Sequence, residues 1–97
     1  MPNNLNQDRI ITLLITNSSK TIPASLGAKA ISVFNVSTST TNGTVNGGTT
    51  IGDFASVDIT LVPSSWRDYN SSNTNTLVGM IITSPAATCT LEVTILA

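Results

Sequence analysis

The chain has 97 residues, a formal net charge of −1 and 9% charged residues, against about 25% in an average soluble domain. This length suits a single domain, and its four basic residues are scattered, so the sequence offers no basic patch for nucleic acid. No apolar run is long enough for a membrane span, and one Cys without any His excludes the usual zinc sites.

Ser, Thr and Asn fill the polar positions that charged residues would otherwise occupy. The chain holds 12 Ser, 16 Thr and 10 Asn. Hydroxyl and amide groups cost less to remove from water than charges do, and they pair readily with a neighbour's backbone or with trapped water. This composition favours a surface that is buried in an assembly. The alternative is that Thr is common here only because it fits a pleated sheet.

The N-terminal residues 1–8 are polar, and we expect a flexible arm in which Leu5 is a candidate interface residue. Residues 8–16 predict the first strand, and one of its faces is apolar: Ile11, Leu13 and Ile15. Ile10 and Leu14 make the other face apolar as well. Both faces should therefore be covered, within the core or at an interface, and Ile10 and Leu14 are interface candidates.

The next segments predict a brief strand, then a loop or single helical turn, then a strong strand: residues 20–22, 24–28 and 29–38. Alternation in the strong strand predicts that Ile31 and Val33 face one layer. Phe34 and Val36 then face the other layer.

Two Asn-Gly dipeptides, at residues 42–43 and 46–47, are typical of tight hairpin turns because both residue types tolerate positive φ. They predict a short edge strand at residues 44–45. Residues 56–62 predict another strand, with three apolar residues inward: Val57, Ile59 and Leu61. Pro63 ends this strand because it cannot donate a hydrogen bond to a neighbouring strand.

The longest predicted connection, residues 63–76, holds the only Trp and the only Tyr of the chain. Trp66, Arg67 and Tyr69 belong to the residue types that dominate protein interfaces. This group predicts either an aromatic anchor at a protein interface or a platform for stacking sugars. The alternative is that Trp66 folds back and covers an open end of the sandwich.

The cleanest alternation lies at the C-terminal end, in residues 88–96. Its inward residues are Cys89, Leu91, Val93 and Ile95, and its outward residues are Thr90, Glu92 and Thr94. Cys89 is expected to be a small buried apolar residue. With the apolar run 77–83 and the Pro-containing segment between them, this pattern predicts an antiparallel hairpin.

Together these patterns predict an all-β fold: a single antiparallel β-sandwich or jelly-roll-like domain of six to seven short strands over residues 9–97. The acidic residues do not form an acid–base pair, since Asp58 and Glu92 stand on outward positions of different strands. Asp53, beside a Gly-rich stretch, is the only hint of a calcium site. The sequence therefore predicts a non-enzymatic protein with no catalytic residue, no cofactor and no metal.

Four stretches follow one another along the chain: GAKAISVFNV at residues 27–36, GTVNG at 43–47, SVDI at 56–59 and NTLVGMII at 75–82. This order of elements, over about residues 22–96, resembles that of small phage virion proteins. The resemblance implies a compact β-sandwich, often a trimer, that decorates a capsid or forms the base of a fibre or tail attachment. It also implies a virion location after synthesis in the host cytoplasm, and no catalytic residues.

The first hypothesis is thus a structural component of a phage particle that associates with itself and with a major capsid or tail protein, and binds neither nucleic acid nor membrane. The alternative is a carbohydrate-binding or adhesin-like module that stacks sugars on Trp66 and Tyr69. A stable oligomer without sugar favours the first hypothesis. A monomer whose Trp fluorescence changes with glycans favours the second.

Overall fold

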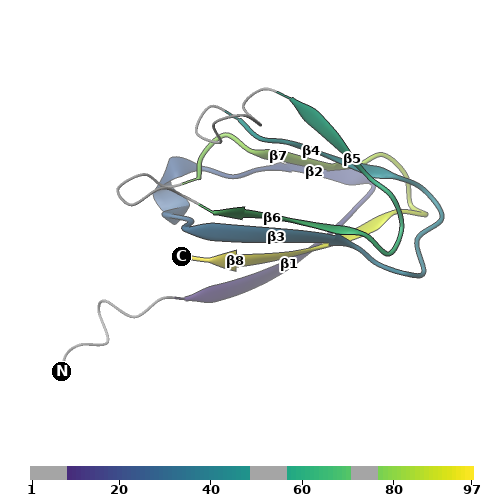
Figure 1. Ribbon diagram of the computed structural model, residues 1–97, viewed down its shortest axis with the longest axis horizontal. Helices are drawn as coiled ribbons and strands as arrows, with labels where there is room; N and C mark the ends of the chain where they lie inside the picture. The colour runs from purple at the N-terminus through teal and green to yellow at the C-terminus, as the bar shows by residue number, and fades with distance from the viewer. Residues whose placement is uncertain (1–8, 49–56, 71–76) are drawn as a thin grey trace.

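The computed structural model describes residues 9–48, 57–70 and 77–97. Within them the chain forms two four-stranded antiparallel sheets, packed face to face (Figure 1). The strands are β1 (Ile10–Thr16), β2 (Ser18–Thr21), β3 (Ala30–Asn35), β4 (Gly43–Asn46), β5 (Asp58–Leu61), β6 (Trp66–Asn70), β7 (Ile81–Ser84) and β8 (Thr90–Leu96). The predicted all-β sandwich is confirmed, with eight strands instead of six to seven. The expected arm, residues 1–8 with Leu5, lies outside the described residues.

The strands of each sheet come from distant parts of the chain. Sheet A has the order β1-β8-β3-β6, and sheet B has the order β2-β7-β4-β5 (Figure 1). The chain passes from β1 to β2 at Asn17, whose φ of 51° lies in the left-handed region that Asn tolerates. The backbone N–H of Asn17 donates to Ser84 Oγ at 2.8 Å, which ties this crossing to the end of β7. Between β2 and β3, the segment predicted as a loop or a single helical turn contains a short 3-10 helix, Ala24–Leu26.

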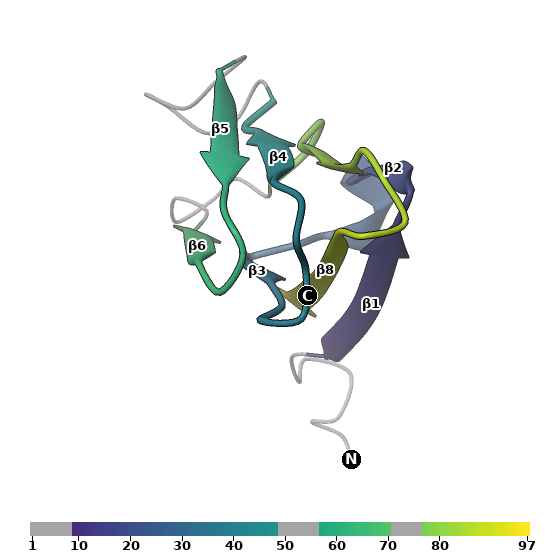
Figure 2. The same cartoon turned by 90° about the vertical axis from the view of Figure 1, so that its right-hand side faces the viewer.

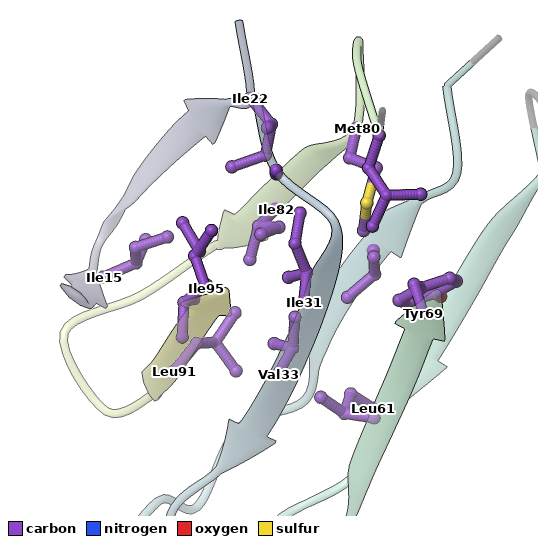
Figure 3. Close-up of a cluster of buried hydrophobic side chains, with 14 of the residues drawn as sticks. Ile15, Ile22, Ile31, Val33, Leu61, Tyr69, Met80, Ile82, Leu91 and Ile95 are labelled. Atoms are coloured by element: carbon purple, nitrogen blue, oxygen red, sulfur yellow. The ribbon is translucent and has the colours of Figure 1, made fainter. Parts of the chain in front are cut away.

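The inward faces of the two sheets form one apolar core (Figure 3). β8 contributes Leu91, Val93 and Ile95, all with 0% exposure, as its alternation predicts. Other strands and connections supply the remaining large side chains: Ile15, Ile22, Ile31, Val33, Val45, Leu61, Tyr69, Leu77, Met80 and Ile82. Each fully buried aliphatic side chain contributes about 1.5–3 kcal/mol to stability. The prediction that Cys89 is a buried, unpaired residue is also confirmed.

A buried amide ties one end of the sandwich together. Asn35 is fully buried at the end of β3, and its Nδ2 donates to the carbonyl of Leu61 at 2.9 Å and to that of Thr41 at 3.1 Å. Its Oδ1 lies 4.0 Å from the Sγ of Cys89. Asn35 therefore links sheet A to β5 and to the connection that leaves β3.

The predicted C-terminal hairpin is wrong. β7 lies in sheet B, where it pairs with β2 and β4, whereas β8 lies in sheet A, where it pairs with β1 and β3. The segment between them carries the chain from one sheet to the other, and Ser84 Oγ lies within hydrogen-bond distance of the Cys89 carbonyl. Alternation defines which residues face the core, but it does not specify the strand that pairs with each edge.

The short strand predicted between the two Asn-Gly dipeptides is present as β4. Its predicted position at an edge is wrong, since β4 lies between β7 and β5. Gly43 lies within β4, and a Cβ placed on it would come within 2.8 and 2.9 Å of the Cδ atoms of Leu91 in the facing sheet. Gly43 therefore allows the two sheets to approach closely. Among the described glycines at positions 43, 47 and 48, the one with positive φ is Gly48, at 71°.

Candidate functional site

Large apolar side chains lie exposed on the outer face of sheet A, the face turned away from sheet B. Figure 2 shows the two sheets as separate layers. One row crosses all four strands, since Leu14 lies opposite Glu92, Glu92 opposite Phe34, and Phe34 opposite Trp66. Leu14 is 67% exposed and Trp66 is 64% exposed. Ile10, four residues before Leu14 on the same face of β1, is 74% exposed. We call this whole side of sheet A the outer face.

A shallow hollow of about 220 Å³ lies on this face beside the row. Three of its lining residues on the middle strands β3 and β8 have small side chains: Ala30, Ser32 and Thr94. Its lining includes Ala30, Ser32, Asp68, Asn70, Thr94 and Leu96. Trp66 stands two residues before Asp68 on the same face of β6, and it is not among the residues that line the hollow.

The charges on the described strand residues of the outer face are two carboxylates. Glu92 stands between Leu14 and Phe34, and Asp68 lies opposite Ser32 in the next row. Covering a carboxylate without a compensating donor or cation is costly. A partner that packs on this face therefore needs basic or hydrogen-bond-donating groups at these two positions.

The structure brings together three of the predicted interface residues and separates two others. Ile10, Leu14 and Trp66 share the outer face. Arg67 and Tyr69 lie on the opposite, inward side of β6, and Tyr69 is 3% exposed in the core. Tyr69 therefore cannot form a stacking surface with Trp66. The idea that Trp66 covers an open end of the sandwich is also wrong, because its side chain is exposed on a sheet face.

The prediction of a long connection over residues 63–76 is wrong for residues 66–70, which form β6. The connection after Pro63 is a tight turn in which Ser64 has φ of 69°. The charged residues Arg67 and Asp68 made this segment resemble a loop, although edge strands often carry charges. The high strand propensity of Trp and Tyr is the signal that could have identified the strand. Phe34, Asp68 and Glu92 are the outer-face residues that sequence reasoning did not assign to an interface.

Burial raises the pKa of the Tyr69 hydroxyl above its ordinary value of 10.0, and the charge of Arg67 and a hydrogen bond to its side chain partly oppose this rise. In Figure 3 the Tyr69 side chain lies on β6 among the core residues. Arg67 shares the inward side of β6 with Tyr69, so the same edge strand supplies both the ring and the charge beside it.

We expect the stability of the fold to fall as the pH rises above about 10. Over that range the unfolded chain has released the Tyr69 proton while the folded protein still holds it, so the unfolding free energy decreases with pH. Since the chain has one Tyr, the absorbance of tyrosinate reports Tyr69 alone. Tyr69→Phe is the control, and its denaturation midpoint should fall less steeply with pH. Equal slopes for both proteins would contradict the assignment.

Within residues 9–48, 57–70 and 77–97, no group of three or more His, Cys, Asp and Glu side chains could hold a metal ion. The same residues include no helix with the length and apolar character of a membrane span. Asp53, the earlier hint of a calcium site, lies outside them. Comparison with protein-family models, with curated proteins and with solved structures found no match.

Proposed function

We propose that this protein is a non-enzymatic structural subunit that packs against neighbouring subunits through the outer face of sheet A. The observation that carries the proposal is the row in which Leu14, Phe34 and Trp66 lie across one sheet face. Large apolar side chains gathered on one face mark interaction surfaces, and Trp is among the residues that dominate interface energies. The low overall charge of the chain supports the same role, because few charges would have to be removed from water.

The setting that we propose is a phage particle, in which the protein is a capsid decoration or cement protein or a fibre or tail attachment module. The β-sandwich and the resemblance to small phage virion proteins support this setting. The partners would be further copies of the chain, with a trimer favoured by the resemblance, and a major capsid or tail protein. Glu92 and Asp68 on the outer face indicate that the partner surface presents basic or donor groups.

Trp66→Ala is expected to raise the Kd of self-association at least tenfold, about 1.4 kcal/mol, because it removes the largest side chain of the row. The melting temperature should fall by less than about 4 °C, since the Trp66 side chain is 64% exposed in the monomer. Sedimentation equilibrium measures the first quantity and calorimetry the second.

Ile81→Ala is the matched control for this experiment. Ile81 is an exposed apolar residue at the start of β7 in sheet B, with 41% exposure. Its truncation should leave the Kd unchanged within about twofold. The proposal fails if the wild-type chain stays monomeric at high concentration, or if Trp66→Ala lowers stability strongly and leaves association intact.

A second candidate function is carbohydrate binding at the hollow on the outer face, with Trp66 two residues before Asp68 on the same face of β6. Asp68, Asn70 and Ser32 line the hollow and offer hydrogen-bonding groups to sugar hydroxyls, while the indole of Trp66 offers an apolar face. Because Trp66 is the only Trp, its fluorescence reports binding directly. A monomeric chain whose fluorescence shifts with oligosaccharides, and loses that shift in Asp68→Ala, would favour this function over the first.

A further inference from the structure

The four edge strands of the sandwich differ in charge. β2 contains Lys20, β5 contains Asp58, and β6 contains Arg67 and Asp68. Charged residues in an edge strand discourage pairing with another chain. β1 is the longest edge strand, with seven residues, and it contains no charged residue, proline or glycine. It runs along one margin of the sandwich in Figure 2, and it is the one described edge without such protection.

The backbone of β1 has hydrogen-bonding groups that point away from β8. Arg9 and Ala97 exchange both backbone hydrogen bonds, at 2.7 and 2.8 Å. Antiparallel pairs alternate, so odd-numbered residues of β1 bond to β8 and even-numbered residues turn their N–H and C=O groups outward. The carbonyl of Leu96, opposite Ile10, agrees with this pattern, since it accepts from Lys29 on its other side at 2.7 Å. β8 is the only described strand that pairs with β1.

We infer that β1 pairs antiparallel with β1 of a second copy, about a two-fold axis at Thr12. The inference deepens the proposed function and rests on it, because it takes the chain to be a subunit that packs against its own copies. It differs from the proposed function in one respect, since a two-fold dimer takes the place of the trimer that the resemblance favours. In this register Thr12 lies opposite Thr12 of the second copy. Ile10 then lies opposite the second copy's Leu14, and Ile11 opposite its Leu13. Apolar residues thus meet apolar residues on both faces of the joined sheet.

A second copy fits this edge because the sequence of β1 is complementary to itself in that register. No like charges oppose each other within the paired segment, and the edge has no charge that would select a different partner. Ile10 and Leu14, the two most exposed large apolar side chains among the described residues, come together at the seam and cover each other. The two copies of sheet A then form one continuous sheet, and their outer faces form one surface.

Thr12→Cys tests the pairing and its register together. Residues that exchange hydrogen bonds across an antiparallel pair have Cα atoms about 5.5 Å apart, within the reach of a disulfide. Mild oxidation of Thr12→Cys is expected to convert most of the protein into a covalent dimer on a non-reducing gel. The native Cys89 is buried and should not take part.

Thr16→Cys is the matched control, because Thr16 is an exposed residue on the same face of the same strand. In the inferred register it lies far from its equivalent in the second copy, so it should remain monomeric on the gel. Absence of the dimer for Thr12→Cys, or equal cross-linking of Thr16→Cys, would overturn the inferred register.

Thr12→Pro removes the N–H that points toward the second copy and leaves the hydrogen bonds to β8 in place. It is expected to raise the Kd of the dimer, measured by light scattering, at least tenfold and to leave the circular dichroism spectrum unchanged, while Thr12→Val keeps the dimer.

If Trp66→Ala abolishes self-association and Thr12→Pro does not, the β1 pairing is wrong and the proposed function stands. If only Thr12→Pro abolishes it, the pairing stands and the outer face is not the self-association surface. A wild-type trimer would overturn the pairing, since a two-fold axis closes at two copies.

Discussion

Asn35→Ala is expected to lower the free energy of unfolding by about 2–4 kcal/mol. The amide of Asn35 donates to the carbonyls of Leu61 and Thr41, and the bond to Leu61 is fully buried. Without the amide, the Leu61 carbonyl stays buried and no water molecule replaces the lost donor, which costs about 1–3 kcal/mol. The space left by the side chain adds a cavity cost. Urea denaturation followed by circular dichroism measures the change.

Two control variants separate these causes. Asn35→Asp keeps the size of the side chain but replaces its donor by an acceptor, so it should destabilise the fold at least as much as Asn35→Ala does. Asn70→Ala truncates an exposed Asn of β6 and should change the unfolding free energy by less than about 0.5 kcal/mol. A loss below about 0.5 kcal/mol for Asn35→Ala would show that the buried amide does not hold this end of the sandwich.

Gly43→Ala is expected to cost about 1–3 kcal/mol, because its methyl group would overlap the Leu91 side chain in the facing sheet. Leu91 has 0% exposure, so neighbouring core residues hold it in place. If this contact is the cause, a smaller residue at position 91 should relieve it. Leu91→Ala alone should cost about 2–5 kcal/mol, and the double variant should cost at least about 1 kcal/mol less than the sum.

Gly27→Ala provides the control for the cycle. Gly27 has φ of 67°, and no atom lies within 4 Å of the position its Cβ would take. The alanine there should cost about 1 kcal/mol through backbone strain alone, and Leu91→Ala should not relieve it. Additive effects of Gly43→Ala and Leu91→Ala would show that the sheets can move apart and that close approach is not why position 43 is glycine.

The sequence predicts which residues of each strand face the core better than it predicts which strands pair. In β8 the alternation of Leu91 and Val93 with Glu92 was sufficient to define both faces. The partners of β7 and β8 could not be predicted, since pairing depends on contacts between distant parts of the chain. The same holds for β4, whose short polar sequence suggested an edge although it lies inside sheet B.

The candidate site was predictable in part for a geometric reason. Ile10 and Leu14 are separated by an even number of residues, so a strand places them on one face. Trp66 and Tyr69 are separated by an odd number, and β6 places them on opposite faces. Treating residues 63–76 as a loop removed that constraint and grouped the two aromatic residues on one surface. The row across sheet A required the strand order, which the sequence alone does not contain.

The strand order also bears on how the chain folds. β4 and β5 are the only hydrogen-bonded strands in the described fold that follow each other in sequence. All other pairings close long loops before any contact stabilises them, which places the chain among slow-folding, millisecond-to-second proteins. During synthesis β1 emerges long before its neighbour β8. The uncharged strand β1 thus stays unpaired until β8 has been synthesised, and this interval is when the nascent chain is most exposed to aggregation.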